Sequence, residues 1–95
     1  MALIIKTDGS TKEILNPTLE QLQEAVGGYI EIVRINPDWA EAILDAHGIG
    51  AEYMYCNEEG KLIGLEYNST ATILTDFNNI IVGNVVLMYE GEDEE

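Results

Sequence analysis

Basic side chains are what this sequence has least of. Its 95 residues include only four lysines and arginines against 18 aspartates and glutamates, so the formal net charge at pH 7 is −14. Nucleic acids and anionic membranes carry dense negative charge, and a surface this acidic repels both. We therefore expect neither direct nucleic-acid binding nor membrane binding, and a basic protein is the favoured kind of partner.

Cysteine and histidine occur once each. This excludes the common structural zinc sites, which combine four such ligands, and it leaves Cys56 without a partner for an internal disulfide. No apolar stretch approaches the ~20 residues of a membrane helix, and the apolar run 2–5 is too short for a secretory signal. The sequence predicts a cytoplasmic protein with no metal and no other cofactor.

Recognisable catalytic motifs are also missing. His47 falls where a helix is expected to end, a place that favours a protonated imidazole through the helix dipole. Cys56 lies just before Glu58 and Glu59, whose charges disfavour a thiolate, so we expect a small buried side chain. Gly48 and Gly50 form an isolated Gly-x-Gly, which is not sufficient for a phosphate-binding loop. We predict no catalytic residue and a protein that is not an enzyme.

The apolar residues, 46% of the chain, are sufficient for one modest core. We predict a single domain over residues 1–90, followed by a disordered acidic tail at 91–95. The tail holds four of the 18 acids, so the domain itself keeps fourteen acids against four bases, a net charge of −10. The acidity is a property of the domain as much as of its tail.

The first third of the chain reads as a hairpin followed by a helix. Asp8-Gly9 lies between the apolar segments 2–6 and 12–15 and is typical of a tight β-turn. Thr18 and Gln21 have the spacing of a capping box, with Asn16 as an alternative cap, and a glycine pair at 27–28 ends the helix.

The central segment 29–35 is β-branched and aromatic and reads as a strand. Its alternation places apolar side chains on both faces, which favours a central position in a sheet. Asn36 and Pro37 then predict the cap and first residue of a second helix, over 38–46.

The remainder predicts a second hairpin, a short capped segment and a final strand. The hairpin joins 52–56 to 61–65 through a turn at 57–60, with Gly60 in the left-handed region. Residues 68–74 form a short helix or a turn, and 80–89 form a strand in which Gly83 is a bulge or a tight turn. The predicted fold class is α+β: one small domain with a mostly antiparallel sheet of about five strands and two helices packed on one face.

Several segments, in order and at familiar intervals, resemble a family of small phage and mobile-element proteins catalogued only as a domain of unknown function. They are Gly27 to Val33, Cys56 to Leu65, Asn68, Ala71-Thr72 and Ile80 to Val86. The resemblance covers most of the chain and implies no activity, cofactor or catalytic residue. It implies a non-structural accessory protein in the cytoplasm of a host cell, and such genes often encode proteins that act against host defences.

The acidic residues are the main candidates for a binding surface. Asp38, Glu41 and Asp45 have the spacing of one helical stripe, and Glu58 and Glu59 add two charges in the predicted turn. Helical carboxylates ~5–6 Å apart are a coarse imitation of a phosphate backbone. We therefore expect a non-enzymatic protein that covers a basic, nucleic-acid-binding surface of a host or defence protein. The alternative is that the acids only maintain solubility.

Tyrosines suggest a second kind of site. Tyr53 and Tyr55 share one face of a predicted strand, and Tyr67 follows nearby in the sequence, so the three are candidates to line a pocket for a small ligand. Such a pocket could lie at a sheet edge or between two copies of a homodimer. A third alternative is an assembly or adaptor module.

Overall fold

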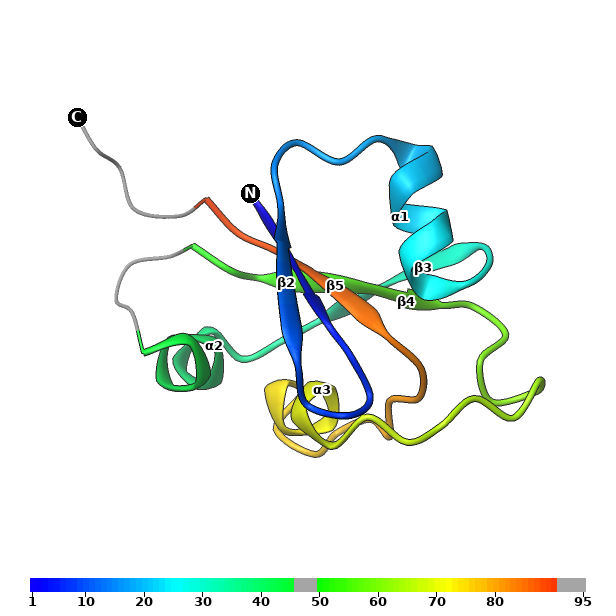
Figure 1. The fold of residues 1–95 in the computed structure, drawn as a ribbon. Coiled ribbons are helices and arrows are strands. Elements are labelled where there is room, and N and C mark those ends of the chain that lie inside the picture. Colours follow the sequence, from blue (N-terminus) through cyan, green and yellow to red (C-terminus); the bar gives the residue numbers. More distant parts are fainter. Residues whose placement is uncertain (46–49, 91–95) are drawn as a thin grey trace.

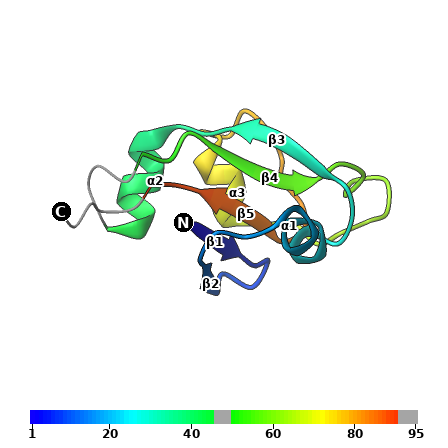
Figure 2. The same cartoon turned by 90° about the horizontal axis from the view of Figure 1, so that it is seen from above.

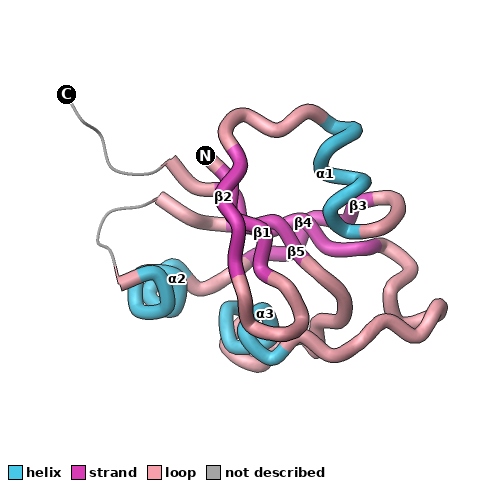
Figure 3. Tube along the Cα trace, viewed as in Figure 1, coloured by secondary structure: helices cyan, strands magenta, loops and turns pink. Residues whose placement is uncertain are grey.

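Five antiparallel strands and three short helices form the described part of the molecule, an α+β domain (Figures 1 and 3). The computed structural model describes residues 1–45 and 50–90. His47 and the predicted tail lie outside these ranges. In chain order the elements are β1 (Ala2–Ile5), β2 (Thr11–Ile14), α1 (Leu19–Val26), β3 (Ile30–Arg34), α2 (Pro37–Leu44), β4 (Tyr53–Asn57), α3 (Ser69–Leu74) and β5 (Val85–Met88).

The strand order across the sheet is β2-β1-β5-β4-β3, and every neighbouring pair is antiparallel. β5, the last strand in the sequence, is therefore the middle strand of the sheet. Its Leu87 lies opposite Leu3 on one side and Met54 on the other. All three side chains are buried, so the centre of the sheet is also the centre of the core.

The first hairpin is confirmed. The Asp8 carboxylate accepts a hydrogen bond from the Ser10 backbone N–H at 2.8 Å, and Gly9 has a φ of +89°. Only a residue without a Cβ adopts that backbone conformation at little cost, so Gly9 lets the chain reverse between β1 and β2.

The capping box at α1 is confirmed too. Thr18 is the cap: its hydroxyl accepts from the Gln21 N–H at 3.1 Å, and the Gln21 side chain accepts from the Thr18 N–H at 2.9 Å. Gly27 ends the helix in the left-handed conformation, with φ +84°. Local sequence therefore fixes both ends of α1.

The helices lie on both faces of the sheet, which corrects the expectation that they share one face (Figures 1 and 2). From α1, Leu22 and Val26 pack with Ala2 and Val86 on one side. On the other side α2 and α3 cover the larger cluster, which contains Leu3, Ile5, Ile35, Ala40, Met54, Cys56, Ala71, Leu74, Ile81, Val85 and Leu87. Because successive residues of a strand face opposite ways, each inner strand supplies both clusters.

β3 is an edge strand, and the prediction of a central strand is wrong. The prediction relied on apolar side chains on both faces, and both faces are in fact partly covered: Ile30 packs with the α1 cluster and Val33 with the opposite one. Apolar residues on both faces show that both faces of a strand are covered, but they do not show whether both of its edges pair with other strands. In the part of the chain that the structure describes, β3 pairs along one edge, with β4.

The second hairpin is not formed. Residues after β4 do turn, with the Gly60 N–H bonded to the Asn57 carbonyl at 3.2 Å, but the chain keeps turning until the Leu65 N–H bonds the Gly60 carbonyl. β3 and β5 already occupy the two edges of β4, so a returning strand at 61–65 has nowhere to pair.

Gly60 itself does not lie in the left-handed region, contrary to the prediction; Gly64 does, with φ +75°. Gly60 is needed for space instead, because a Cβ there would lie 2.9 Å from Val82 Cγ2. The turn residue was identified correctly, but its physical role was not.

The described residues form three helices rather than the two predicted. α2 begins as predicted, with the Asn36 side chain accepting from the Asp38 N–H, but it ends at Leu44 because Asp45 adopts φ +55°. The segment 68–74 is a helix, α3, capped by Asn68. The Asn36 N–H bonds the Leu74 carbonyl at 2.8 Å and holds α2 beside α3.

The final strand is shorter than predicted: β5 spans only Val85–Met88. Before it, Val82 forms an isolated bridge with Tyr67, and Gly83 makes a bend with φ +80°. No helix among the described residues has both the length and the apolar character that crossing a membrane requires.

Candidate functional site

The five candidate acids form two groups at opposite ends of the β3–β4 pair. Asp38, Glu41 and Asp45 belong to α2 and its cap, which follow the carboxyl end of β3. Glu58 and Glu59 follow the carboxyl end of β4. Because β3 and β4 run antiparallel, their carboxyl ends lie at opposite ends of the pair.

The predicted stripe on the second helix is incomplete. Asp38 is exposed in the first turn of α2, whereas Glu41 is half-buried. Asp45 lies beyond the helix, where its left-handed backbone directs the chain away from the helical spiral. The three carboxylates therefore do not repeat along one helical face as the spacing suggested.

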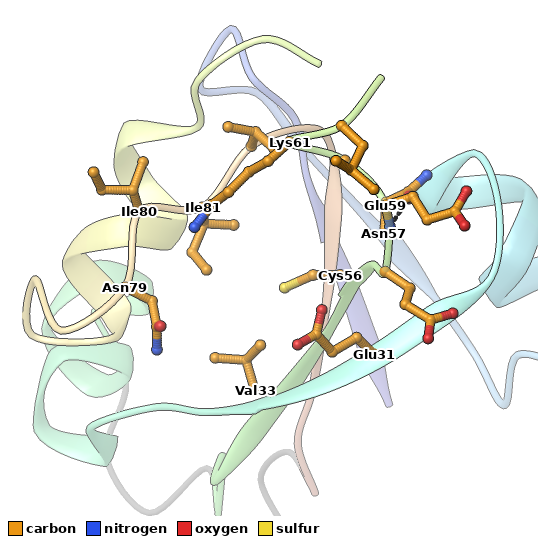
Figure 4. Close-up of a pocket in the computed structure, with 13 residues that line it drawn as sticks. Glu31, Val33, Cys56, Asn57, Glu59, Lys61, Asn79, Ile80 and Ile81 are labelled. Atoms are coloured by element: carbon orange, nitrogen blue, oxygen red, sulfur yellow. Dashed lines mark hydrogen bonds between the residues drawn. The ribbon is translucent and has the colours of Figure 1, made fainter. Parts of the chain in front are cut away.

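A pocket of about 140 Å³ lies beside Glu58 and Glu59, on the face of the sheet that α2 and α3 cover (Figure 4). Its floor comes from β3 and β4, one wall from the turn after β4, and the other from the segment that leads toward β5. The lining residues are Glu31, Val33, Cys56, Asn57, Glu58, Glu59, Gly60, Lys61, Leu62, Asn79, Ile80, Ile81 and Val82.

Figure 4 shows polar groups from different elements turned toward this hollow. The Glu31 carboxylate and the Cys56 thiol approach from neighbouring strands, where their residues are opposite each other in the ladder. The Lys61 ammonium and the Asn79 amide reach in from the two walls. The pocket thus combines one base with three acids, a small excess of negative charge.

Asn57 sets the position of the turn that carries Glu58 and Glu59. Its buried amide donates to the Val26 carbonyl at 3.1 Å, and its side-chain oxygen accepts from the Glu59 N–H at 2.7 Å. The Glu58 N–H bonds the Tyr29 carbonyl at 2.9 Å. The backbone under both acids is therefore fixed to α1 and to the start of β3, while their side chains remain exposed.

Cys56 is buried, as expected, and its thiol is not an activated nucleophile. Burial raises the pKa of the Cys56 thiol from 9.0 to about 12, and the nearby Glu31 charge acts in the same direction. At neutral pH the group is a protonated thiol, which is a poor nucleophile and a poor metal ligand. Among the described residues no three His, Cys, Asp or Glu side chains gather closely enough to hold a metal ion.

Only two of the three candidate tyrosines lie together. Tyr53 and Tyr55 are in edge-to-face contact, with ring centroids 5.5 Å apart and an angle of 82° between the rings. They pair with Met88 and Val86 of β5, whereas Tyr67 pairs with Val82 before that strand begins. Tyr53 also lines a shallow surface hollow with Tyr89.

Sequence reasoning identified Glu58 and Glu59 but missed Glu31, Lys61 and Asn79. Glu31 carried one available signal: it is the acid that interrupts the apolar residues of its strand. Lys61 and Asn79 carried none, because the chain path that brings them opposite β3 depends on contacts far apart in the sequence.

The family model of a domain of unknown function, DUF3846, matches residues 1–95. The chain belongs to this family. The resemblance to a family of unknown function is thereby confirmed, while phage or mobile-element origin stays a prediction. No curated protein and no solved structure matches the chain.

Proposed function

We propose that this chain is a non-enzymatic acidic protein that binds and covers a basic surface of another protein. The expected target is a nucleic-acid-binding surface of a host or defence protein. This chain would be a phage or mobile-element product that binds the target in the host cytoplasm. Its acids would occupy the place of the nucleic-acid phosphates.

One observation carries the proposal: the acids are displayed on the surface. Of the fourteen acids within residues 1–90, every one except Glu41 is exposed. Carboxylates that serve a fold are usually buried, paired or used as caps. The first-turn acids Glu20 and Asp38 suit their helix dipoles. Asp8, Glu66 and Asp76 accept hydrogen bonds within the fold. These roles involve a minority of the exposed acids.

The cost of this charge supports the proposal as well. A net charge far from zero destabilises a compact chain through self-repulsion. A target with a basic surface would relieve that repulsion on binding and would be attracted over a distance of about one Debye length, ~8 Å at physiological salt. The protonated Cys56 thiol agrees with a binding role rather than with nucleophilic chemistry.

The test is affinity capture from the natural host with two charge-matched variants. The first is Glu31→Lys with Glu58→Lys and Glu59→Lys, at the pocket. The second is Glu92→Lys with Asp93→Lys and Glu94→Lys, in the terminal acidic run. Each triple change raises the formal net charge from −14 to −8. Partners are identified by mass spectrometry, and each complex is then reconstituted and measured at 50 and 500 mM salt.

We expect a stoichiometric basic partner whose association slows as salt rises, and whose affinity falls far more with the pocket variant than with the terminal one. Equal losses from the two variants would reduce the mechanism to bulk charge. A stoichiometric partner whose binding is insensitive to salt and to both variants would overturn the proposal.

A further inference from the structure

Within residues 1–45 and 50–90, no strand pairs with the outer edge of β3, which leaves a set of backbone hydrogen-bonding groups there. The Glu58 N–H bonds the Tyr29 carbonyl at 2.9 Å, and the Ile35 N–H bonds the Glu52 carbonyl at 3.1 Å. These bonds flank the ladder, and in an antiparallel pair the residues that bond the neighbour alternate. Tyr29, Glu31, Val33 and Ile35 therefore face β4, and the N–H and C=O groups of Ile30, Ile32 and Arg34 point outward.

Among the described residues this edge has only one of the features that usually protect an edge strand, the charged residues Glu31 and Arg34. Natural sheets protect their edges with prolines, bulges, charged side chains or a covering element. β3 is regular over five residues, contains no proline, and its central Ile32 is 62% exposed. The opposite edge, β2, also carries two charges, Lys12 and Glu13, but it has only four residues and Ile14 is its one apolar side chain. β3 has three apolar residues among its five. Of the two edges of the sheet, β3 is the one suited to receive another strand.

The pocket lies directly beside this edge. Glu31 and Val33 are both residues of β3 and lining residues of the pocket. Its wall residues Leu62 and Ile80 are 86% and 60% exposed, which is unusual for large apolar side chains. A strand added along β3 would place every second side chain on the pocket's face, next to Glu31, and the others on the face of Ile32.

Charge decides between the candidate occupants of the edge. A second copy of this chain would also have a formal net charge of −14 and would be repelled. An extended basic segment would meet Glu31, Glu58 and Glu59, with Lys61 as the only base among the lining residues. Opposite charge favours the basic segment over self-pairing.

We propose that the β3 edge binds an extended basic segment of the partner as a sixth strand, with a lysine or arginine of that segment reaching the pocket beside Glu31. This inference rests on the proposed function and names the form of its partner. Main-chain hydrogen bonds to Ile30, Ile32 and Arg34 hold the segment, and alternation of basic and apolar residues selects it.

The test uses two blocked eight-residue peptides of the same composition. One has four Lys-Val repeats, so an extended backbone puts all lysines on one face and all valines on the other. The other arranges the same residues in blocks of two, which places both kinds on both faces. We expect the alternating peptide to bind at least tenfold more tightly by calorimetry. Hydrogen exchange at the Ile30, Ile32 and Arg34 amides should slow in that complex alone.

Two proline variants probe the edge from the protein side. Ile32→Pro removes an outward N–H without removing a bond to β4, and an edge strand tolerates this. Thr11→Pro is the matched control. The Lys6 N–H bonds the Ser10 carbonyl, so even-numbered residues of β2 face β1 and the Thr11 N–H points outward. Ile32→Pro should weaken the alternating peptide at least tenfold, and Thr11→Pro should leave its affinity unchanged.

Three results would overturn the inference. The first is equal binding of the two peptides without protection of these amides. That result would mean that basic peptides bind the acidic surface but do not pair with the β3 edge. The second is no binding of either peptide at 1 mM, a result independent of the host capture that tests the proposed function. The third is a dimer of the free chain in sedimentation equilibrium that Ile32→Pro abolishes, because the edge would then belong to a second copy. Amide exchange on the unmodified protein decides the question even where Ile32→Pro fails to fold.

Discussion

The side-chain amide of Asn68 donates a hydrogen bond to the Gly83 carbonyl at 2.9 Å and a second one to the Ile5 carbonyl at 3.1 Å. Its oxygen accepts from the Ala71 N–H at 3.0 Å, which caps α3. One fully buried residue thereby joins the end of β1, the start of α3 and the bend before β5.

Asn68→Ala should therefore be strongly destabilising. It leaves two buried carbonyls without these donors and removes a helix cap, so we expect a loss of roughly 2–4 kcal/mol. Urea unfolding measures the loss, and Asn78→Ala, at an exposed residue after α3, is the control with almost no effect. A loss as small as that of the control would mean that other donors replace the Asn68 amide.

Gly83 and Gly64 allow backbone strain to be separated from lack of space. Both have similar positive φ values, +80° and +75°. A Cβ at Gly83 would lie 2.7 Å from Leu65 Cδ1, whereas one at Gly64 meets nothing within 4 Å. Gly64→Ala should cost the left-handed strain alone, ~1–2 kcal/mol.

Gly83→Ala should cost more than Gly64→Ala, because Leu65 or the bend has to move as well. Thermal unfolding should show the difference as an additional fall in Tm, at about 4–8 °C for each kcal/mol in a domain of this size. Equal Tm values for the two variants would show that Leu65 moves aside without cost.

Cys56 gives a prediction for pH. Burial, with a further contribution from Glu31, raises the thiol pKa from 9.0 to about 12 in the folded chain. The contribution of the thiol to stability is therefore fully present below about pH 9. It is lost as the pH rises toward 12, because the unfolded chain releases a proton that the folded chain keeps.

The test compares unfolding free energies of the unmodified chain and Cys56→Ala at pH 7.5 and 10.5. The variant has its own packing cost, so the informative quantity is the change with pH. We expect the unmodified chain to lose more stability than the variant between the two pH values. Parallel losses would show that the thiol ionises in the folded chain as it does in the unfolded one.

Asp76 combines a hydrogen bond with an unusual backbone. It accepts from the indole N–H of Trp39 at 3.0 Å, with a φ of +60°, and Phe77 follows at +61°. Asp76→Asn keeps an oxygen acceptor and a residue type that tolerates positive φ, so its stability should lie within about 0.5 kcal/mol of the original. Asp76→Ala loses both and should cost roughly 1–2 kcal/mol.

Trp39 is the single tryptophan, so its fluorescence reports on this contact directly. We expect Asp76→Ala to shift the emission maximum of the folded protein and Asp76→Asn to leave it in place. Unchanged emission in both variants would contradict a role for the bond in orienting the indole.

The parts of the fold that the sequence predicted well are those encoded by neighbouring residues. Thr18 with Gln21, Asn36 with Pro37, and Asp8 with Gly9 each act within one turn of chain, and each formed as expected. Strand order is different in kind. Whether β3 is central or at an edge depends on where β5 lies, more than 50 residues later in the sequence.

The candidate site shows the same limit. Glu58 and Glu59 were predictable as exposed turn acids, but their neighbours in space were not. Glu31 comes from a strand 27 residues earlier than Glu58, and Asn79 from a segment 21 residues later. The α2 acids and the turn acids lie at opposite ends of the β3–β4 pair because these two strands run antiparallel, and the spacing of residues in the sequence did not predict this separation.

Because β5 is the middle strand, the sheet is completed only after this last strand has been synthesised. Among the described residues, the sheet joins the ribbons β1–β2 and β3–β4 through β5. Translation that stops short of this strand leaves two separate ribbons with apolar faces uncovered, a form that proteases and chaperones recognise. Incomplete copies are therefore expected to be degraded rather than to accumulate as partly active fragments.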